Sequence, residues 1–340
     1  MKILKKLIRS LYKRLWKEEY SKIKNLHKID KLENLSFLNY WVDYLQNNDI
    51  NKKIEILLQN TDKKSQETVN IIIKRIKLLI SCYGNKDIVY VNVNDIYTEE
   101  EKLNQKESKK CIKSYKNKNC LPYNFYAPNI LYNHCGLKEI QFVKNYIKGK
   151  DFIDGGACIG DSAFILEKYY SPNFVYAFEP LNENIKYINK TIEMNSLKSI
   201  KPINLGLGIK TEKIELSYDP VNISSTSLLR DNSKQNEKQT EKIDITTIDN
   251  FVKENNLNLG LIKLDVEGFE SNVIAGALES IKKYRPVMLI SIYHTPKDFF
   301  EIKPLIESLN LNYKFKIRKC SPDTIYFETM LIAYPKELES

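Results

Sequence analysis

The last two thirds of the chain alternate between short apolar runs and segments whose apolar residues recur every three or four positions. Apolar runs of about four to eight residues predict buried strands, and the wider spacing predicts amphipathic helices. Alternation of the two predicts an α/β fold, a parallel sheet with helices on both faces. The predicted strands are 152–154, 174–178, 200–205, 213–217, 261–264, 287–292, 312–317 and 329–333, and the predicted helices are 137–147, 161–170, 182–195, 246–255, 268–283 and 298–309.

The N-terminal third has a different pattern. Apolar residues recur with a helical period over 1–24, 34–47 and 65–82, and one short strand is predicted at 88–91. The run from 99 to 119 is polar and rich in Lys, Glu and Asn, which predicts a linker or flexible loop. We therefore predict a mainly helical accessory region over 1–118 and an α/β domain over 119–340.

The first predicted helix has one apolar and one basic face. Its apolar face includes Leu4, Leu11 and Trp16, and lysines and arginines occupy the positions between them. Two interpretations remain open for residues 1–24. The helix either lies on an anionic membrane surface or packs its apolar face on the rest of the accessory region. For the whole accessory region, we expect either docking at a membrane or a homodimer face.

The net positive charge of the chain arises from this N-terminal third. The 340 residues hold 53 Lys+Arg and 43 Asp+Glu, a net charge of +10, and residues 1–120 alone hold 26 basic against 15 acidic side chains. The basic surplus therefore concerns a partner of the accessory region rather than the substrate. Nucleic acid is not the expected partner, because the lysines lack the interleaved aromatic residues of a stacking surface.

Composition also indicates where the protein is located. No apolar run approaches the roughly 18 residues of a membrane span, and lysines interrupt the start of the chain where a signal peptide would be apolar. The six cysteines form no C-x-x-C pair, which indicates reduced thiols. We expect a cytoplasmic protein, with peripheral contact at the inner membrane surface under the membrane interpretation above.

Three glycines follow the strand predicted at 152–154. Gly155, Gly156 and Gly160 lie between Asp154 and a predicted helix, so the backbone can approach a ligand closely there. The spacing differs from the G-x-G-x-x-G of dinucleotide sites, and the carboxylate of Asp154 would repel a phosphate. A cationic or zwitterionic nucleoside such as S-adenosylmethionine (SAM) fits better.

Acidic residues end three of the predicted strands: Asp154, Glu179 and Asp265. The carboxyl ends of parallel strands face one crevice, so these side chains should converge. Glu179 follows Asp154 by one helix and one strand, the place from which a carboxylate accepts hydrogen bonds from ribose hydroxyls. His294 ends a further strand of the same edge, and two roles remain open for it, a base or substrate contact and a packing role.

Five segments resemble the FkbM family of SAM-dependent methyltransferases. They are FIDGGACIGD, VYAFEP, INLGLG, TTIDNFV and LIKLDVEGFE, in this order, and the resemblance covers about residues 150–335. It implies a Rossmann-like class I methyltransferase fold with a seven-stranded sheet and an antiparallel last strand. It also implies O-methylation of a hydroxyl, usually on a sugar or polyketide-type substrate.

The resemblance assigns roles to residues at the strand ends. The SAM loop comprises Asp154, Gly155, Gly156, Ala157 and Gly160, Glu179 is the ribose ligand, Asn204 and Leu205 border the adenine, and Asp265 and Glu267 face the methyl-transfer zone, where Asp265 also contacts the cofactor. Many methyltransferases have an acidic residue beside the adenine amine, where this chain has Asn204. With His294, the residues Asp265 and Glu267 are the predicted catalytic group.

A polar segment from Ser224 through Arg230 to Lys242 predicts a mobile loop, read either as a lid over the acceptor or as a surface insertion. No metal site is predicted, because Cys111, Cys120, His134 and Cys135 match no known zinc spacing.

The leading hypothesis is therefore a SAM-dependent O-methyltransferase acting on a sugar hydroxyl of a surface polysaccharide or its precursor. The alternatives are an NAD-dependent Rossmann oxidoreductase or epimerase, and a non-catalytic membrane-tethered binding module.

Overall fold

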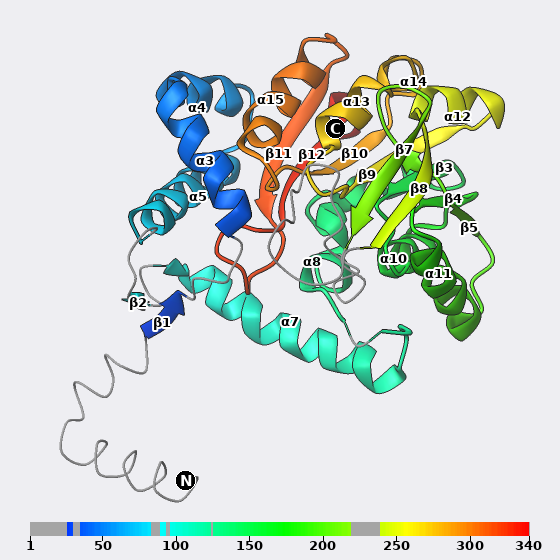
Figure 1. Ribbon diagram of the computed structural model, residues 1–340, viewed down its shortest axis with the longest axis horizontal. Coiled ribbons are helices and arrows are strands. Elements are labelled where there is room, and N and C mark those ends of the chain that lie inside the picture. The colour runs from blue at the N-terminus through cyan, green and yellow to red at the C-terminus, as the bar shows by residue number, and fades with distance from the viewer. Residues whose placement is uncertain are drawn as a thin grey trace, which may run out of the picture.

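The computed structural model describes residues 26–29, 35–82, 89–92, 96–123, 125–218 and 239–339 (Figure 1). The helix predicted over 1–24, the serines at 224–227 and Arg230 lie outside the described residues.

A seven-stranded sheet forms the centre of the molecule, in the order β11-β12-β10-β9-β3-β4-β5. Strand β12 runs antiparallel to both of its neighbours, and the other strands run parallel to one another. The predicted α/β class and the antiparallel last strand are thereby confirmed. The strands are β3 (Asp151–Gly155), β4 (Val175–Phe178), β5 (Ile200–Ile203), β9 (Leu259–Leu264), β10 (Val287–Ser291), β11 (Tyr313–Lys319) and β12 (Thr329–Pro335).

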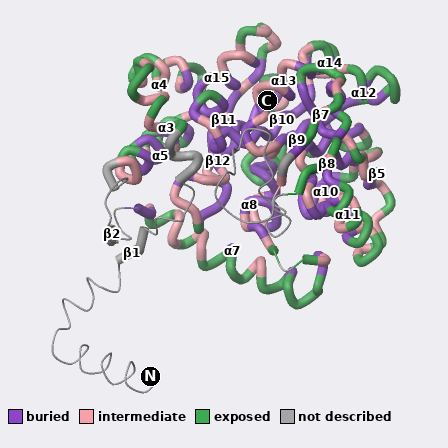
Figure 2. The backbone as a smooth tube through the Cα atoms, viewed as in Figure 1, coloured by how far each residue is buried: buried purple, intermediate pink, exposed green. Residues whose placement is uncertain are grey.

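Helices cover both faces of this sheet, as Figure 1 shows. Side chains alternate across a strand, so Ile153 and Ile262 join one core while Phe152 and Leu261 join the other. The central strands are buried along their whole length, and the exposed residues lie mostly on the helices (Figure 2). The covering helices are α10 (Asp161–Tyr170), α11 (Asn182–Asn195), α12 (Ile248–Glu254), α13 (Glu270–Ala275), α14 (Leu278–Tyr284) and α15 (Pro296–Glu307).

The N-terminal region is mainly helical. Its described elements are β1 (Leu26–Ile29), α3 (Leu35–Asn47), α4 (Ile50–Leu58), α5 (Lys63–Cys82), β2 (Val89–Asn92) and α7 (Glu99–Lys118), and β1 pairs with β2. The prediction of a linker or loop at 99–119 is wrong, because residues 99–118 form α7. Thr98 and Glu101 form a reciprocal capping box at the start of α7, three glutamates occupy its first turn, and lysines occupy its last turn.

The N-terminal helices share the core of the sheet. Trp41 is fully buried against Phe299 and Phe300 of α15, with ring centroids 5.4 and 6.0 Å away. Apolar residues of α5 belong to the same core as β11 and β12. The domain boundary after residue 118 stays a prediction. No helix in the described ranges is long and apolar enough to cross a membrane.

Local features differ from the sequence-based expectation at several places. The one helix predicted at 268–283 is divided into α13 and α14. A small sheet of β6 (Gly206–Leu207), β7 (Glu212–Tyr218) and β8 (Gln239–Thr246) lies beside the main one, so residues 239–242, which were predicted to belong to a mobile loop, are part of a strand. Between 128 and 147 the chain forms α8 (Pro128–Leu131), a 3-10 helix at His134–Val143 and α9 (Lys144–Ile147), where one helix was predicted at 137–147.

Candidate functional site

The glycine turn after β3 is held against the residue that follows β9. Gly156 has a φ of +72°, and a Cβ added to it would lie 1.9 Å from the carbonyl oxygen of Asp265. No other residue type fits so close a contact at positive φ. Gly160, at φ +81°, then starts α10. The turn and the end of β9 therefore form one continuous surface.

Asp154 lies beneath this surface rather than on it. Its side chain is fully buried, with Oδ1 3.0 Å from the Nζ of Lys263, and its Oδ2 accepts a hydrogen bond of 2.6 Å from Ser162. The ammonium of Lys263 also donates to the carbonyl oxygens of Gly155 and Gly156. The charge of Asp154 is thus balanced within the protein, so this side chain shapes the turn and does not itself attract a cation.

The lysine at the centre of this pair was missed from the sequence. Burial by itself lowers the pKa of Lys263, but the carboxylates of Asp154 and Asp265 outweigh it and raise the pKa above its usual range. The sequence signal was a lysine inside the apolar run of β9, in a strand whose residues are all buried.

Glu179 lies at the end of β4, on the other side of the turn. Its Oε2 accepts from the backbone N–H of Cys158 at 3.0 Å, and its Oε1 accepts from the N–H of Leu181 at 3.2 Å. Burial raises its pKa to about 7 despite these hydrogen bonds. Asn204 is exposed, and its amide donates to the carbonyl oxygens of Glu179 and Pro180, while Leu205 beside it is half-buried.

Asp265, Glu267 and His294 come together at the ends of β9 and β10. The Nε2 of His294 lies 3.6 Å from Oδ1 of Asp265 and 3.8 Å from Oε1 of Glu267. Its Nδ1 lies 3.0 Å from Oε1 of Glu270, a buried residue that the sequence analysis missed. The two predicted acids are each 19% exposed along their side chains, whereas His294 is 1% exposed.

The reason for predicting His294 as the base was a pKa near neutrality, and its surroundings shift the pKa away from there. Burial by itself lowers the pKa of the imidazole, but the carboxylates of Glu270, Glu267 and Asp265 outweigh it and raise the pKa to about 10. At neutral pH the ring is therefore an imidazolium that already holds its proton. His294 can donate a hydrogen bond and balance charge, and the accessible proton acceptors are Asp265 and Glu267.

Two further residues that the sequence analysis missed adjoin this group. The hydroxyl of Tyr293 lies 3.3 Å from Oδ1 of Asp265 and 3.4 Å from Oε1 of Glu328. Burial, followed by repulsion from Asp265, raises the pKa of Glu328 to about 8. The available signals were a tyrosine next to His294 and an acid directly before a predicted strand.

Comparison with known proteins shows the family of the chain. The family model described as "Methyltransferase FkbM domain" matches residues 154–332, from the acid of the glycine turn into the last strand. The chain belongs to the FkbM methyltransferase family. It is therefore a methyltransferase, which sets the NAD-dependent alternative aside.

Individual FkbM-type relatives are distant in sequence. The crystal structure of methyltransferase FkbM from Methylobacillus flagellatus KT matches with a TM-score of 0.55 at 19% identity, over 86% of this chain and 60% of that chain. "Methyltransferase 1" of Beauveria bassiana (strain ARSEF 2860) is 21% identical over 173 residues, which are 46% of this chain and 70% of that protein. The chain thus spans less than two thirds of the FkbM crystal structure, and the likeness shows the fold.

One group in the methyltransferase site has the spacing of metal ligands. Asp265, Glu270 and His294 each place a ligand atom within 4.8 Å of the others. The oxygens of Glu270, however, already accept from the backbone N–H groups of Val266 and Gly268, and one of them faces His294. Charge pairing within the turn accounts for this arrangement, so we assign no metal to it.

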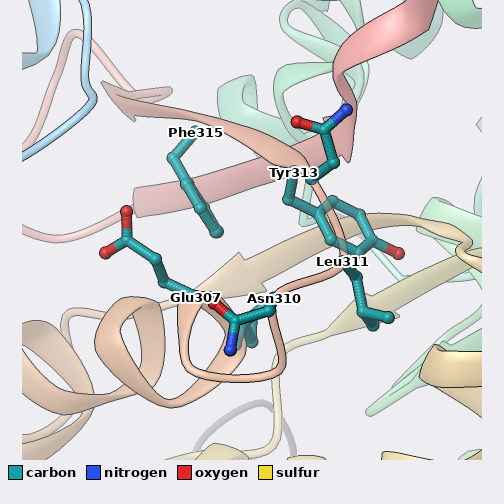
Figure 3. A pocket seen from close by; sticks show the side chains of 7 residues that line it. Glu307, Asn310, Leu311, Tyr313 and Phe315 are labelled. Carbon is teal, nitrogen blue, oxygen red and sulfur yellow. The ribbon is translucent and has the colours of Figure 1, made fainter.

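A separate cavity of about 290 Å³ lies away from the methyltransferase site. It is lined by residues of α15 and of the segment leading into β11, among them Glu307, Asn310, Tyr313 and Phe315 (Figure 3). These residues lie at the amino end of β11, whereas the predicted site residues lie at the carboxyl ends of the parallel strands. The cavity contains none of the predicted site residues.

Proposed function

We propose that this FkbM-family protein transfers a methyl group from SAM to a hydroxyl, most simply a sugar hydroxyl of a surface polysaccharide or its precursor. The observation that carries the proposal is the junction of the glycine turn with Asp265. The backbone N–H of Asp265 donates to the carbonyl of Gly155 at 3.0 Å, which sets the acidic group directly beside the turn.

The residues of the turn fit SAM. The close contact at Gly156 excludes a side chain at this position, so the turn offers backbone to a nucleoside here. The oxygens of Glu179 accept three hydrogen bonds, from the backbone N–H groups of Cys158 and Leu181 and from the side chain of Asn184, so one of their roughly four lone-pair sites is left for a ribose hydroxyl. Asp154 would support the turn from below with Gly155, Ala157 and Gly160, and Asn204 and Leu205 would border the adenine.

Asp265 and Glu267 would supply the proton acceptor that methyl transfer to a hydroxyl oxygen needs. When SAM is bound it supplies a methyl carbon on a sulfonium: the acceptor oxygen forms the new O–C bond, the C–S electron pair goes to sulfur, and the hydroxyl proton leaves. Asp265 and Glu267 are placed to take that proton, and the imidazolium of His294 offsets their mutual repulsion. Alignment does most of the work in such a reaction, so the base need not be strong.

Charge narrows the class of acceptor. The acidic side chains at 265, 267 and 270 outnumber the one imidazolium among them, so a phosphate or carboxylate next to the reacting oxygen would be repelled. A neutral sugar hydroxyl meets no such repulsion. We place the protein in the cytoplasm. The basic N-terminal region would contact either the inner membrane surface, where lipid-linked precursors lie, or a second copy of the chain.

Calorimetric titration with S-adenosylhomocysteine (SAH) tests the cofactor assignment. We expect wild-type protein to bind SAH, and Glu179→Gln to bind it about tenfold more weakly because a hydrogen bond to ribose is lost. Glu183→Gln, which breaks only an exposed pair with Lys186, is the matched control and should bind like wild type. Absence of SAH binding by the wild type would refute the assignment.

The acceptor requires a separate measurement. Mass spectrometry of surface glycans from cells with and without the protein should show one methyl group missing from a neutral sugar when the protein is absent. Identical glycans would rule out the polysaccharide acceptor while leaving the cofactor assignment standing.

A further inference from the structure

The loop of residues 320–328, between β11 and β12, lies at the edge of the sheet that carries the site. Strand β11 runs parallel to β10, so its carboxyl end meets the same edge as the ends of β9 and β10. The last residue of the loop is Glu328, whose Oε1 lies 3.4 Å from the hydroxyl of Tyr293. Phe327 packs edge-on against the ring of Tyr293, with centroids 5.5 Å apart. The loop thus completes the wall of the site next to Asp265.

Side chains from the N-terminal region hold the backbone of this loop. Gln105 donates to the carbonyl oxygen of Pro322 at 2.7 Å, and Tyr97 donates to that of Asp323 at 3.1 Å. Arg75 donates to the carbonyl oxygen of Ile325 at 3.0 Å. These three donors come from α5, from α7 and from the residues just before α7. They hold three loop carbonyls that lie more than 200 positions away in the sequence.

A buried ionic cluster supports the same contacts. Arg75 pairs with Glu101 through two hydrogen bonds of 2.9 and 2.5 Å, and Glu101 also lies 3.1 Å from the Nζ of Lys319. Lys319 in turn donates to the carbonyl of Ser321 at 2.5 Å. Burial by itself raises the pKa of Glu101, but the hydrogen bond from Arg75 and the charge of Lys319 outweigh it and lower the pKa to about 2.

Such a cluster indicates positioning rather than simple packing. Buried ion pairs add little net stability compared with apolar residues of the same size, and directional polar contacts fix one geometry. Apolar side chains would be enough to attach the N-terminal helices, as they do at Trp41. At the loop the chain instead uses four donors, three of them from the N-terminal region, which bind the backbone carbonyls of residues 321, 322, 323 and 325.

We propose that the N-terminal region acts as a brace for the loop of residues 320–328, and that through this loop it places Glu328 in the acceptor site as a hydrogen-bond partner of the substrate hydroxyls. The inference rests on the proposed methyltransferase function. It gives the N-terminal region a catalytic purpose distinct from membrane contact. Glu328 is the residue that meets the acceptor, and Arg75, Tyr97, Glu101 and Gln105 are positioning residues.

Hydrogen–deuterium exchange of the full chain tests the brace. The double variant Tyr97→Phe/Gln105→Ala removes two donors to the loop without leaving a buried charge unpaired. We expect the amides of residues 321 and 323–328 to exchange about tenfold faster than in wild type. Tyr146→Phe is the matched control, since the Tyr146 hydroxyl also donates to backbone carbonyls, those of Tyr284 and Arg285, and it should leave the loop unchanged. Unchanged loop exchange in the double variant would overturn the brace.

Methyl transfer tests the role of Glu328. The probe is a neutral glycan extract from cells lacking the protein, with SAM labelled on its methyl group. We expect Glu328→Gln to lower incorporation about tenfold, because a hydrogen bond to the acceptor is lost, while its affinity for SAH stays that of wild type. Glu337→Gln, which alters a surface pair with Arg285 far from Glu328, should keep full incorporation. Full incorporation by Glu328→Gln would overturn its place in the acceptor site.

Combining the variants separates positioning from general destabilisation. If the brace acts through Glu328, adding Tyr97→Phe/Gln105→Ala to Glu328→Gln should cause no further loss of incorporation, whereas independent structural damage would multiply the losses. Multiplied losses would therefore contradict the proposal. Failure of wild-type protein to bind SAH would instead refute the proposed function. The hydrogen–deuterium exchange of the loop would still show whether the N-terminal region holds it.

Discussion

Lys263 is a charged residue in the middle of a buried strand, and it determines the geometry of the glycine turn. Its ammonium pairs with Asp154 and binds two carbonyl oxygens of the turn. A buried charge tolerates the loss of its partner poorly, because no solvent can replace it. The site therefore depends on a residue that need not touch either substrate.

Replacing Lys263 by Met should lower the free energy of unfolding by about 3–5 kcal/mol, because Asp154 is left charged and unpaired. The double variant Lys263→Met/Asp154→Asn should recover a large part of this loss, since the buried charge is gone. Urea unfolding followed by circular dichroism measures both. A double variant less stable than the single one would show that the pair is not the source of the effect.

Glu179 makes stability depend on pH in a definite direction. Its folded pKa is raised from 4.5 to about 7, so the folded state binds this proton more tightly than the unfolded state does. The carboxylate consequently costs no stability below pH 4.5 and costs most above pH 7. Relative to wild type, the melting temperature of Glu179→Gln should therefore rise as pH increases through this window. A constant difference between pH 5 and 8 would contradict the buried charge.

At the scale of elements, α7 shows how a helix forms from a sequence without a clear apolar face. It buries few of its twenty residues, Ser108 and Tyr115 among them, so its start depends on the capping box of Thr98 and Glu101. Such a cap contributes about 1 kcal/mol.

Thr98→Ala should lower the free energy of unfolding by about 1 kcal/mol, because the side-chain acceptor for the N–H of Glu101 is lost. Thr68→Ala is the control, since its hydroxyl bonds only to a carbonyl within α5 and it does not cap a helix. Chemical denaturation distinguishes the two. Equal effects would mean that the cap does not determine the stability of α7.

The strands β3, β4, β9, β10 and β12 could be predicted because they are buried along their whole length and consist largely of apolar residues. Strand β8 was missed because it is charged on one side, although Ile243 and Ile245 alternate with polar residues in the pattern of a half-buried strand. The helix α7 was likewise signalled only by Thr98 and Glu101, three positions apart. The signals for α7 and β8 were a capping pair and the alternation of apolar and polar residues, and neither element contains a long apolar run.

At the scale of the whole molecule, the N-terminal helices and the sheet form a common core. Trp41, Leu57 and Ile72 belong to the same buried cluster as Phe315 and Leu331. Such contacts join residues that are far apart in the sequence, so a pattern search along the chain cannot find them. The carboxyl-end residues at 154, 179, 265 and 294 could be expected from topology, whereas Glu328 depends on a loop held by distant side chains.

Trp41→Ala should reduce the free energy of unfolding by about 3–5 kcal/mol, because it leaves a large cavity against Phe299 and Phe300. Unfolding should remain a single transition, with far-UV and near-UV circular dichroism changing together. Two separate transitions would instead indicate an independently stable C-terminal domain starting near residue 119.

The place of β12 between β10 and β11 has a consequence for biosynthesis. A ribosome adds β12 after every other strand of the sheet, so β10 keeps an unpaired edge and β11 has no strand partner until then. The loop before β12 is also fixed only at that stage, by side chains made more than 200 residues earlier. A nascent chain that stops before residue 329 therefore carries an open sheet edge and an incomplete site, which makes it a substrate for chaperones and proteases rather than a partly active enzyme.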